Sequence, residues 1–446
     1  MRLLLAAAEF SPLVRTGGLG EAVAGLAGAL FSAGNEVTVA IPGYRSVEPR
    51  SRKVRGKPWR EVDVPGPSVV AFEDELFDRP GVYGEVPGTA YADNWERFAA
   101  FALAVADLAD GYEILHLHDA HVGIAALVAG TPSVFTIHNA SYPLLAPLAA
   151  MSAIDALAPS ALPNGPLEWF GQANYLKAGI VGAAAVTTVS PTHAVELADD
   201  ATSFGLGGVI RGLPAPIVGI LNGIDTGSWD PMTDPALEVR FDATDAAARR
   251  KNKRALLAEV GLDDGFVLGN VGRMAVQKGL QLLDYDIDAL IAEGARLVFV
   301  GNGELDAMVD GWAARNRRAV AHLPFDERLS RRLSAGADAY LMPSQYEPCG
   351  IGQMYAMRYG APPIAHAVGG LADTVIDVDE DAEHGTGFTF RSFDHPSLTK
   401  TIRRAIRYHA RLPELWETIR RNGATADWSW RRRAEEYEAV YRSVLA

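Results

Sequence analysis

The chain has 446 residues, of which 48% are hydrophobic and 22% are charged, and its formal net charge is -14 at pH 7. This length exceeds what one ordinary hydrophobic core supports, so two globular domains are expected. The acidic balance excludes binding of nucleic acid or anionic membrane through bulk charge, because a polyanionic group would need a local cluster of cations. The single cysteine, Cys349, excludes an internal disulfide and a cysteine metal cluster, and it fits a reducing cytosol.

The amino-terminal sequence MRLLLAAAEF joins a basic residue to a short apolar run, as secretory signal peptides do. Glu9 interrupts the run, and a Gly-rich turn follows instead of a cleavage-like region. Residues 3–8 are therefore predicted to form the first buried strand. No uninterrupted apolar stretch reaches the length of a transmembrane helix, so a cytoplasmic protein without a membrane partner is expected.

Apolar runs that end in polar loops recur along the first half of the chain, with Ala- and Leu-rich stretches of helical period between them. The predicted strands are residues 3–8, 36–41, 114–118, 133–138, 185–190 and 217–222, and two predicted helices are residues 21–32 and 95–108. Ser190 followed by Pro191 marks one helix start, because serine caps helices and proline is tolerated in the first turn. The alternation of strands and helices predicts a parallel, doubly wound α/β sheet.

A second series of strands follows a polar, loop-like stretch near residues 225–245. Its predicted strands are residues 266–271, 296–301, 339–342 and 362–365. The expected domains are therefore residues 1–235 and 236–425, two α/β domains whose sheet edges face one ligand across a cleft. Residues 426–446 are expected to form a helix that packs back on the domains, since Tyr437 and Tyr441 share one face.

Basic runs occur in three places, which are residues 249–254, 315–318 and 431–433. No aromatic residues are interleaved with these cations, and the chain as a whole is acidic. The runs are interpreted as solvated helix faces, and no nucleic-acid partner is expected.

A Gly-rich turn, RTGGLGE, directly follows the first predicted strand and leads into a helix. Gly17 and Gly18 let main-chain amides and the positive end of the helix meet a phosphate, and Arg15 adds charge-assisted hydrogen bonds. The spacing differs from GxGxxG, and no acidic residue closes the second strand at the ribose position. Both observations argue against an NAD-dependent dehydrogenase.

Two histidine motifs, HLHDAH at residues 116–121 and TIHN at residues 136–139, lie at the ends of predicted strands. Three histidines within six residues raise the question of a metal site. Side chains alternate in direction along a strand and no acidic partner pattern accompanies the histidines, so metal ligation is not favoured. Polar groups arranged around a sugar or an acceptor are the preferred interpretation.

In the second half, the loop GRMAVQKG carries two cations, Arg273 and Lys278, directly after a predicted strand. Two cations five residues apart in a loop can both reach one diphosphate and neutralise its charge without a metal ion. Either cation alone is more often a surface charge.

Residues 338–375 place one acidic side chain, Glu347, in a Pro- and Gly-rich turn between an apolar strand and a helix. Gly350 lets backbone amides approach a phosphate, and Cys349 is interpreted as a small buried filler. A carboxylate that fixes sugar hydroxyls beside cations that stabilise a leaving phosphate suits departure of a nucleoside diphosphate from an anomeric carbon.

Together these segments resemble bacterial glycogen synthases and plant starch synthases. The resemblance extends over nearly the whole chain, in the order RTGGLGE, FDRPGVYG with YADNWERFA, HLHDAH, FTIHN, NYLKAGI with AVTTVSPTHA, ILNGID with SWDP, NKRALLAEVGL, GRMAVQKGL, FDERLSRRLSAGADAYLMPS, YEPCGIGQMYAMRYG, GGLADTVID, GTGFTF and DWSW. It implies a retaining GT-B glycosyltransferase with two Rossmann-like domains, a donor of ADP-glucose or UDP-glucose, and an acceptor at the nonreducing end of an α-1,4-glucan. It also implies that no metal or other cofactor is required.

The resemblance assigns roles at matching positions. Arg273 and Lys278 would bind the donor diphosphate, Glu347 would hold the donor sugar, and His138 would lie beside the anomeric carbon on the face where the acceptor attacks. The other donor-side candidates are Arg15, Gly17, Gly18, Asn222, Phe325, Cys349, Gly350 and Ile351. The acceptor-side candidates are Asp119, Asn139 and Tyr83. Tyr83 and Phe325 are candidate ring-stacking residues, and an ordinary packing role stays open for each.

The chain departs from the family pattern on the amino-terminal side. Arg15 stands where the family usually has Lys, Glu21 where it has Asp, and Ala120 where the HDWH motif has Trp. A planar guanidinium is not equivalent to an ammonium at a phosphate, and loss of the indole removes an apolar wall near the acceptor. The usual YQG after the IHN motif is also replaced, by residues 140–143.

These departures leave two alternatives open. One is a small-molecule glycosyltransferase, or a pseudo-glycosyltransferase that joins an activated cyclitol to an amine, on the same scaffold. The other is a silent sugar-nucleotide or glucan-binding protein. The nucleobase, the sugar, the acceptor and the oligomeric state are not determined by the sequence.

Overall fold

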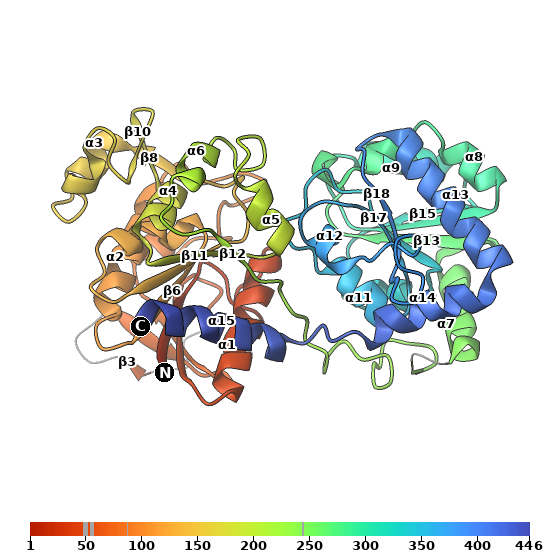
Figure 1. The fold of residues 1–446 in the computed structure, drawn as a ribbon, viewed down its shortest axis with the longest axis horizontal. Helices are drawn as coiled ribbons and strands as arrows, with labels where there is room; N and C mark the ends of the chain where they lie inside the picture. Colours follow the sequence, from red (N-terminus) through yellow and green to blue (C-terminus); the bar gives the residue numbers. More distant parts are fainter. Residues whose placement is uncertain (48–51, 54–57, 87, 243–244) are drawn as a thin grey trace. The chain divides into compact units, whose positions relative to one another are not determined.

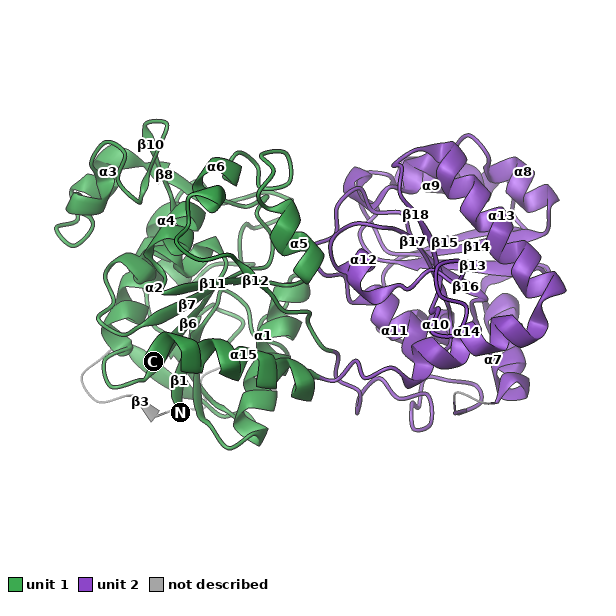
Figure 2. Cartoon of the chain, viewed as in Figure 1, with its two compact units in different colours: residues 1–223, 430–446 green, residues 224–429 purple. Residues whose placement is uncertain are grey.

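The computed structural model describes residues 1–47, 52–53, 58–86, 88–242 and 245–446. The chain divides into two compact units (Figure 2). Unit 1 comprises Met1–Gly223 and Trp430–Ala446, and unit 2 comprises Ile224–Ser429. Each unit is an α/β domain built on its own sheet.

Unit 1 contains a nine-stranded sheet that begins with buried apolar strands. In spatial order its strands are β12 (Val218–Gly219), β11 (Ala185–Thr188), β7 (Ser133–Ile137), β6 (Ile114–His118), β1 (Arg2–Ala6), β2 (Glu36–Pro42), β5 (Ser68–Phe72), β4 (Trp59–Val62) and β3 (Arg52–Lys53). Neighbours from β12 to β5 run parallel, and β4 and β3 extend the sheet in antiparallel fashion. The parallel strands therefore end at one carboxyl edge, where ligands of open α/β sheets bind.

The described helices of unit 1 include three long ones, α1, α2 and α15, and several short ones. They are α1 (Gly18–Ser32), η1 (Glu75–Phe77), α2 (Asn94–Leu108), η2 (Ala120–Leu127), α3 (Leu148–Ser152), η3 (Ala158–Ala161), α4 (Tyr175–Gly182), α5 (Pro191–Glu196), α6 (Gly207–Arg211) and α15 (Trp430–Leu445). A small antiparallel sheet of β8 (Leu145–Pro147), β10 (Gln172–Asn174) and β9 (Glu168–Trp169) lies beside α3 and α4 (Figure 1). The predicted helix start at Ser190 is confirmed, because its side chain accepts a hydrogen bond from the His193 amide.

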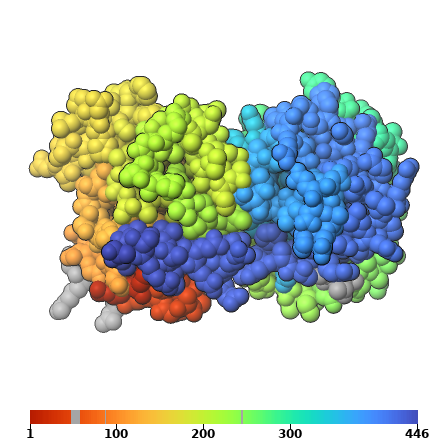
Figure 3. Space-filling model, viewed as in Figure 1, coloured from red at the N-terminus to blue at the C-terminus, as the bar shows by residue number. Residues whose placement is uncertain are grey.

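The carboxyl-terminal helix α15 returns to unit 1 and packs beside α1 (Figures 1 and 3). Its apolar face, including Tyr437 and Tyr441, joins the unit 1 core. Gly25 makes the contact possible, since a Cβ there would lie 2.0 Å from Nε1 of Trp430. The helix is thus an integral layer of unit 1.

Unit 2 is built on a six-stranded parallel sheet. Its strands in spatial order are β15 (Val320–Leu323), β14 (Ala295–Val300), β13 (Phe266–Val271), β16 (Ala339–Met342), β17 (Pro363–His366) and β18 (Phe388–Phe390). Along β13, Phe266 and Leu268 belong to one hydrophobic cluster and Val267 to another. Because strand side chains alternate between faces, both faces of this sheet are covered.

The helices that cover unit 2 are α7 (Ala246–Val260), η4 (Val276–Lys278), η5 (Leu280–Leu283), α8 (Ile287–Ala292), α9 (Asp306–Arg315), α10 (Glu327–Gly336), α11 (Gly352–Arg358), α12 (Gly369–Thr374), α13 (His395–Arg411) and α14 (Pro413–Thr425). None of the helices in the described ranges combines the length and apolarity needed to cross a membrane.

The units divide after Gly223, whereas the sequence suggested a boundary after residue 235. The intervening segment is anchored to unit 2 by an aromatic and ionic contact. Trp229 stacks on Tyr355 with ring centroids 3.8 Å apart, and the guanidinium of Arg331 lies 4.1 Å from the centroid of Trp229. Asp234, which is buried, pairs with the same arginine at 3.2 Å. The polar composition of this segment therefore does not reveal that it packs on unit 2.

Candidate functional site

Unit 1 gathers histidines at the carboxyl ends of β6 and β7. His118 closes β6, and its Nδ1 lies 3.0 Å from Nε2 of His138, which follows β7. Two residues earlier on β6, His116 lies 2.7 Å from the Tyr441 hydroxyl and 2.6 Å from that of Thr136. The family's candidate for the anomeric position, His138, is therefore held by a second imidazole.

These imidazoles are neutral at ordinary pH. Burial lowers the pKa of His116 and of His138 to about 3, and that of His121 to about 4. Burial, together with its two neighbouring histidines, also lowers the pKa of His118 well below its usual range. The contact between His118 and His138 is consequently a hydrogen bond between an N–H and a nitrogen lone pair.

Asp119 holds the start of the segment that carries His138. Its Oδ1 accepts the amide of His138 at 2.7 Å and that of Asn139 at 3.3 Å, and its backbone has a φ of 60°. Burial raises the pKa of this carboxyl to about 7, although the two amide bonds act in the opposite direction. Asn139 in turn accepts the amide and hydroxyl of Ser141 at 3.0 and 2.8 Å. Two of the three predicted acceptor-side residues, Asp119 and Asn139, thus position main chain in this structure.

The Gly-rich turn before α1 is organised by Glu9. Its Oε2 accepts the amides of Thr16 and Gly17 at 2.7 and 3.1 Å, and its Oε1 accepts the Tyr83 hydroxyl at 2.7 Å. The Gly17 amide, which the sequence analysis predicts to bind a phosphate, therefore donates its hydrogen bond to Glu9. Gly18 is exposed and has open space where a Cβ would stand.

The two family departures in this turn contact each other. A guanidinium nitrogen of Arg15 lies 2.6 Å from Oε1 of Glu21. The predicted ring-stacking residue Tyr83 stacks on His121, with centroids 5.0 Å apart. Ala120, at the position of the missing indole, is fully buried.

Several polar atoms at this edge of unit 1 are buried and find no hydrogen-bond partner among the residues that the structure describes. They are Nε2 of His118, Nδ1 of His121, Nε2 of His193 and Oδ1 of Asn222. Buried polar groups are ordinarily paired, so atoms of this kind are available to a ligand's hydroxyl groups.

Unit 2 brings the predicted lysine and carboxylate into direct contact. Nζ of Lys278 lies 2.6 Å from Oε2 of Glu347, and the Ser344 hydroxyl donates to the same oxygen at 2.9 Å. Glu347 is 8% exposed, so the pair is buried enough to be held in a fixed geometry and open enough to meet a ligand. Ser344 was not among the predicted site residues.

Glycines lock the two loops that carry this pair. Gly279 adopts a φ of 74°, and a Cβ there would lie 1.9 Å from the carbonyl oxygen of Pro343. Gly369 has a φ of 44° and approaches the Glu347 carbonyl equally closely, with 2.1 Å to a Cβ. The Gln345 amide also donates to the Gln277 carbonyl at 2.8 Å. The loops after β13 and β16 are therefore fixed to one another through their backbones.

The remaining donor-side candidates of unit 2 differ in exposure. Arg273 is exposed, and its side chain makes no ion pair within the described part of the chain. Phe325 is 54% exposed, and its amide donates to Asn302 at 3.3 Å. Cys349 is buried, as the interpretation of a small filler requires. Gly350 has a φ of 66° and is followed by Ile351, the residue before α11.

Known proteins with similar sequences cover this chain from end to end. The glycogen synthase of Anaeromyxobacter sp. (strain Fw109-5) is 38% identical over all of both chains. The glycogen synthase of Syntrophotalea carbinolica (strain DSM 2380 / NBRC 103641 / GraBd1) is 35% identical over all of this chain and 99% of its own. The chain belongs to the glycogen and starch synthase family. Residues 2–212 match the starch synthase catalytic domain, and residues 252–424 match the glycosyl transferases group 1.

Members of this family are glycosyltransferases, and the fold agrees. The catalytic domain of starch synthase IV from Arabidopsis thaliana, bound to ADP and acarbose, covers 100% of this chain and 99% of its own, with a TM-score of 0.89 and 29% identity. A sucrose-phosphate synthase from Thermosynechococcus elongatus, 19% identical with a TM-score of 0.64, shares the fold alone. The predicted GT-B architecture of two Rossmann-like domains is confirmed, and the enzyme is a glycosyltransferase.

Among the described residues, no group of three or more His, Cys, Asp and Glu side chains is arranged to hold a metal ion. The histidines of unit 1 instead contact one another, Tyr441 and Thr136.

Proposed function

We propose that the enzyme is a retaining glucosyltransferase that transfers glucose from ADP-glucose to the nonreducing end of an α-1,4-glucan, without a metal ion. The observation that carries this proposal is the contact of Lys278 with Glu347 at the carboxyl edge of the unit 2 sheet. A nucleotide sugar joins an anionic diphosphate to an uncharged polyhydroxyl ring. The Lys278 ammonium suits the diphosphate, and the Glu347 carboxylate, 2.6 Å away, suits the hydroxyl groups of the sugar.

In this reaction the ammonium of Lys278, with the exposed guanidinium of Arg273, neutralises charge that develops on the departing diphosphate. Glu347 accepts hydrogen bonds from sugar hydroxyls, and Ser344 keeps the carboxylate aimed. Gly350 and Ile351 present main-chain amides to the donor, and the family likeness is what supports their role. Because the loops are fixed through Gly279, these donors need little reorganisation in the transition state.

His138 is proposed to lie beside the anomeric carbon, on the face from which the acceptor attacks. Its neutral imidazole suits a site where positive charge grows on the sugar, since an imidazolium would oppose that charge. The unpartnered atoms of His118, His121 and Asn222 supply hydrogen-bonding capacity for sugar hydroxyls on the same unit.

Two findings favour adenine nucleotide and glucan over the specialised-metabolism alternative. The starch synthase IV catalytic domain was solved with ADP and acarbose, and the full-length relatives are named glycogen synthases. The departures at Arg15 and Glu21 form a pair with each other and so do not by themselves indicate a new substrate.

The test is incorporation of radiolabelled glucose from ADP-glucose into glycogen, with UDP-glucose as a parallel donor. Incorporation with ADP-glucose, and its loss in Glu347→Ala, is expected. Absence of incorporation in a preparation that binds ADP would eliminate the glucan synthase assignment. Preference for UDP-glucose would correct the nucleobase only.

A further inference from the structure

A groove of about 740 Å³ in unit 2 has no part in the proposed transfer. It is lined by α13, by the segment that follows β18, and by Asp286 and Asp379. Lys278 and Glu347 do not line it. The groove is therefore separate from the donor-binding residues.

Helix α13 gives the groove its charge. The helix has the sequence HPSLTKTIRRAIRYHAR, with five Lys and Arg residues and no Asp or Glu. Lys400, Arg403, Arg404 and Arg407 follow one another at helical spacing and all line the groove. Like charges three and four residues apart destabilise a helix by about 0.2–0.5 kcal/mol per pair, so this stripe is unfavourable unless anions compensate it.

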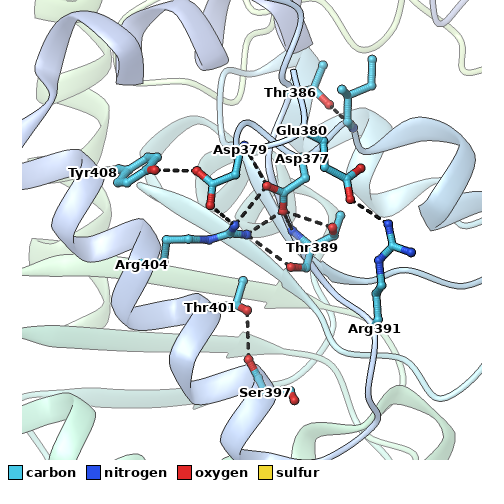
Figure 4. A network of polar contacts seen from close by, with 11 residues as sticks. Asp377, Asp379, Glu380, Thr386, Thr389, Arg391, Ser397, Thr401, Arg404 and Tyr408 are labelled. Atoms are coloured by element: carbon cyan, nitrogen blue, oxygen red, sulfur yellow. Dashed lines mark hydrogen bonds and ion pairs between the residues drawn. The ribbon is translucent and has the colours of Figure 1, made fainter. Parts of the chain in front are cut away.

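The chain compensates only part of the stripe. Arg404 binds Asp377 through two hydrogen bonds of 2.6 and 3.0 Å and also reaches Asp379 (Figure 4). Arg403 pairs with Glu293 at 2.8 Å. The Arg404 contacts hold α13 against the loop after α12, and the Arg403 contact holds it against the end of α8.

Lys400 and Arg407 are the two cations of the stripe that no carboxylate binds directly within the described residues. Both are exposed, and neither makes an ion pair or a side-chain hydrogen bond within the described part of the chain. The two carboxylates at the groove are shared with other partners, although Asp379 also lies close enough for the charge of Arg407 to help lower its pKa. Asp286 already accepts His395 at 3.1 Å and Thr399 at 2.9 Å, and Asp379 accepts Arg404 and Tyr408. In a chain of net charge -14, this leaves a local excess of positive charge.

We propose that this groove binds a small phosphorylated metabolite, with Lys400 and Arg407 holding the phosphoryl group. Arg and Lys are the side chains that bind phosphate most strongly, as a fork and as a point charge respectively. The volume lies within the range of roughly 300–1,000 Å³ typical of sites for small organic ligands, which favours a phosphate ester over free phosphate. Ser392 and Thr401 also line the groove, and such polar residues suit a polar ligand body.

One histidine, His366, connects a residue that lines the groove to the loop that carries Glu347. Nδ1 of His366 lies 2.8 Å from the Ser344 carbonyl oxygen, and Nε2 lies 3.2 Å from that of Arg391, which lines the groove. Ser344 is the residue that holds Glu347. Three contacts, Arg391 to His366, His366 to Ser344 and Ser344 to Glu347, thus connect the groove to the proposed sugar-binding carboxylate.

The experiment is calorimetric titration of the full-length protein, with ADP at saturation to occupy the donor site. The probes are ribose 5-phosphate, 3-phosphoglycerate and fructose 1,6-bisphosphate, with ribose and inorganic phosphate as comparisons. At least one phosphate ester is expected to bind saturably and more tightly than inorganic phosphate, with affinity that falls as salt is added.

The Lys400→Gln/Arg407→Gln double variant is expected to weaken that binding by about tenfold or more, because two charge-assisted contacts are lost. The matched control is Arg411→Gln/Arg421→Gln, which removes the same charge from exposed positions that do not line the groove. It should change the affinity by less than about twofold.

Three results would overturn the proposal. They are absence of binding by any ester at millimolar concentration, equal binding of inorganic phosphate and the esters, and equal weakening by both double variants. Because ADP binding and glucose transfer are measured separately, none of these results bears on the proposed glucosyltransferase activity.

Discussion

At the scale of single residues, the unit 2 site depends on one carboxylate with two partners of its own chain. Lys278 and Ser344 both bind the Glu347 carboxylate, so contacts within the chain orient the group that is proposed to accept sugar hydroxyls. Such preorganisation is where enzymes gain most of their electrostatic stabilisation of a transition state.

Replacement of Glu347 by Gln keeps the shape of the side chain and removes its charge. Glucose transfer is expected to fall by about 10²-fold or more, because sugar hydroxyls lose their acceptor and Lys278 loses its partner. The measurement is the initial rate with ADP-glucose and glycogen, alongside ADP affinity. Glu414→Gln, an exposed carboxylate on α14, is the control. A rate unchanged from that control would show that the carboxylate has no part in transfer.

The histidines of unit 1 link stability to pH. A pKa lowered to about 3 means that folded His116 stays neutral while the unfolded side chain gains a proton below its ordinary pKa of 6.5. The unfolded state therefore binds more protons between these values, and the free energy of unfolding falls as the pH falls through that window. Asp119 acts in the opposite sense, since its pKa is raised to about 7.

The His116 contribution is isolated by a variant that cannot titrate. When the pH is lowered from about 7.5 to about 5, the free energy of unfolding of the wild-type protein is expected to fall by about 2 kcal/mol more than that of His116→Gln. Urea unfolding of both proteins at the two pH values measures the difference. Gln retains partners for Tyr441 and Thr136, so the comparison does not depend on a missing hydrogen bond. Parallel pH dependence of the two proteins would contradict a neutral, buried His116.

Residue identity alone leads to part of the candidate site. The sequence predicts Arg273, Lys278 and Glu347 because cations and a carboxylate in loops after strands suit a nucleotide sugar, and the structure joins Lys278 to Glu347. Glu9 was noticed only as a charge that ends an apolar run, yet it binds two amides and Tyr83. A buried acid just after the first strand, at the edge where ligands bind, is the feature that would have identified it.

At the scale of elements, the contact between α1 and α15 requires the absence of one methyl group. Gly25→Ala would place a Cβ within 2.0 Å of Trp430, so either helix must shift. A loss of about 1–3 kcal/mol in the free energy of unfolding is expected from this overpacking. Gly28→Ala on the same helix has open space around it and should gain up to about 1 kcal/mol from helix propensity. Denaturant titration measures the free energy of unfolding of each variant. Equal values for the two variants would mean that α15 does not pack on α1.

Several strands with long apolar runs are predicted correctly, whereas elements that depend on contacts with residues distant in sequence are not. Predicted strands 114–118, 266–271 and 339–342 coincide with β6, β13 and β16. The sequence analysis does not predict β4 or β5. β4 extends the sheet in antiparallel fashion and alternates in burial less regularly, whereas β5 is a short apolar strand parallel to β2 whose pairing depends on residues distant in sequence. The segment that holds Trp229 was read as a linker, since its anchor depends on Tyr355 and Arg331, which are distant in sequence.

At the scale of the whole molecule, the chain contains two units with separate hydrophobic cores. Lys278 and Glu347 belong to unit 2, and the Glu9 turn and the histidines belong to unit 1. Any ligand that binds one unit in the folded state stabilises it by mass action.

ADP should therefore raise the thermal unfolding temperature of the full-length enzyme through unit 2. A concentration of about 100 times the Kd is expected to add about 2.7 kcal/mol to the stability of the unit that binds it. Lys278→Met removes the ammonium proposed to hold the diphosphate and should abolish most of this gain, whereas Arg421→Gln, an exposed cation on α14, should keep it. Differential scanning calorimetry with and without ADP measures both. If ADP stabilised Lys278→Met as much as the wild-type enzyme, the diphosphate would have to bind elsewhere, and the assignment of the unit 2 loops as the donor site would be wrong.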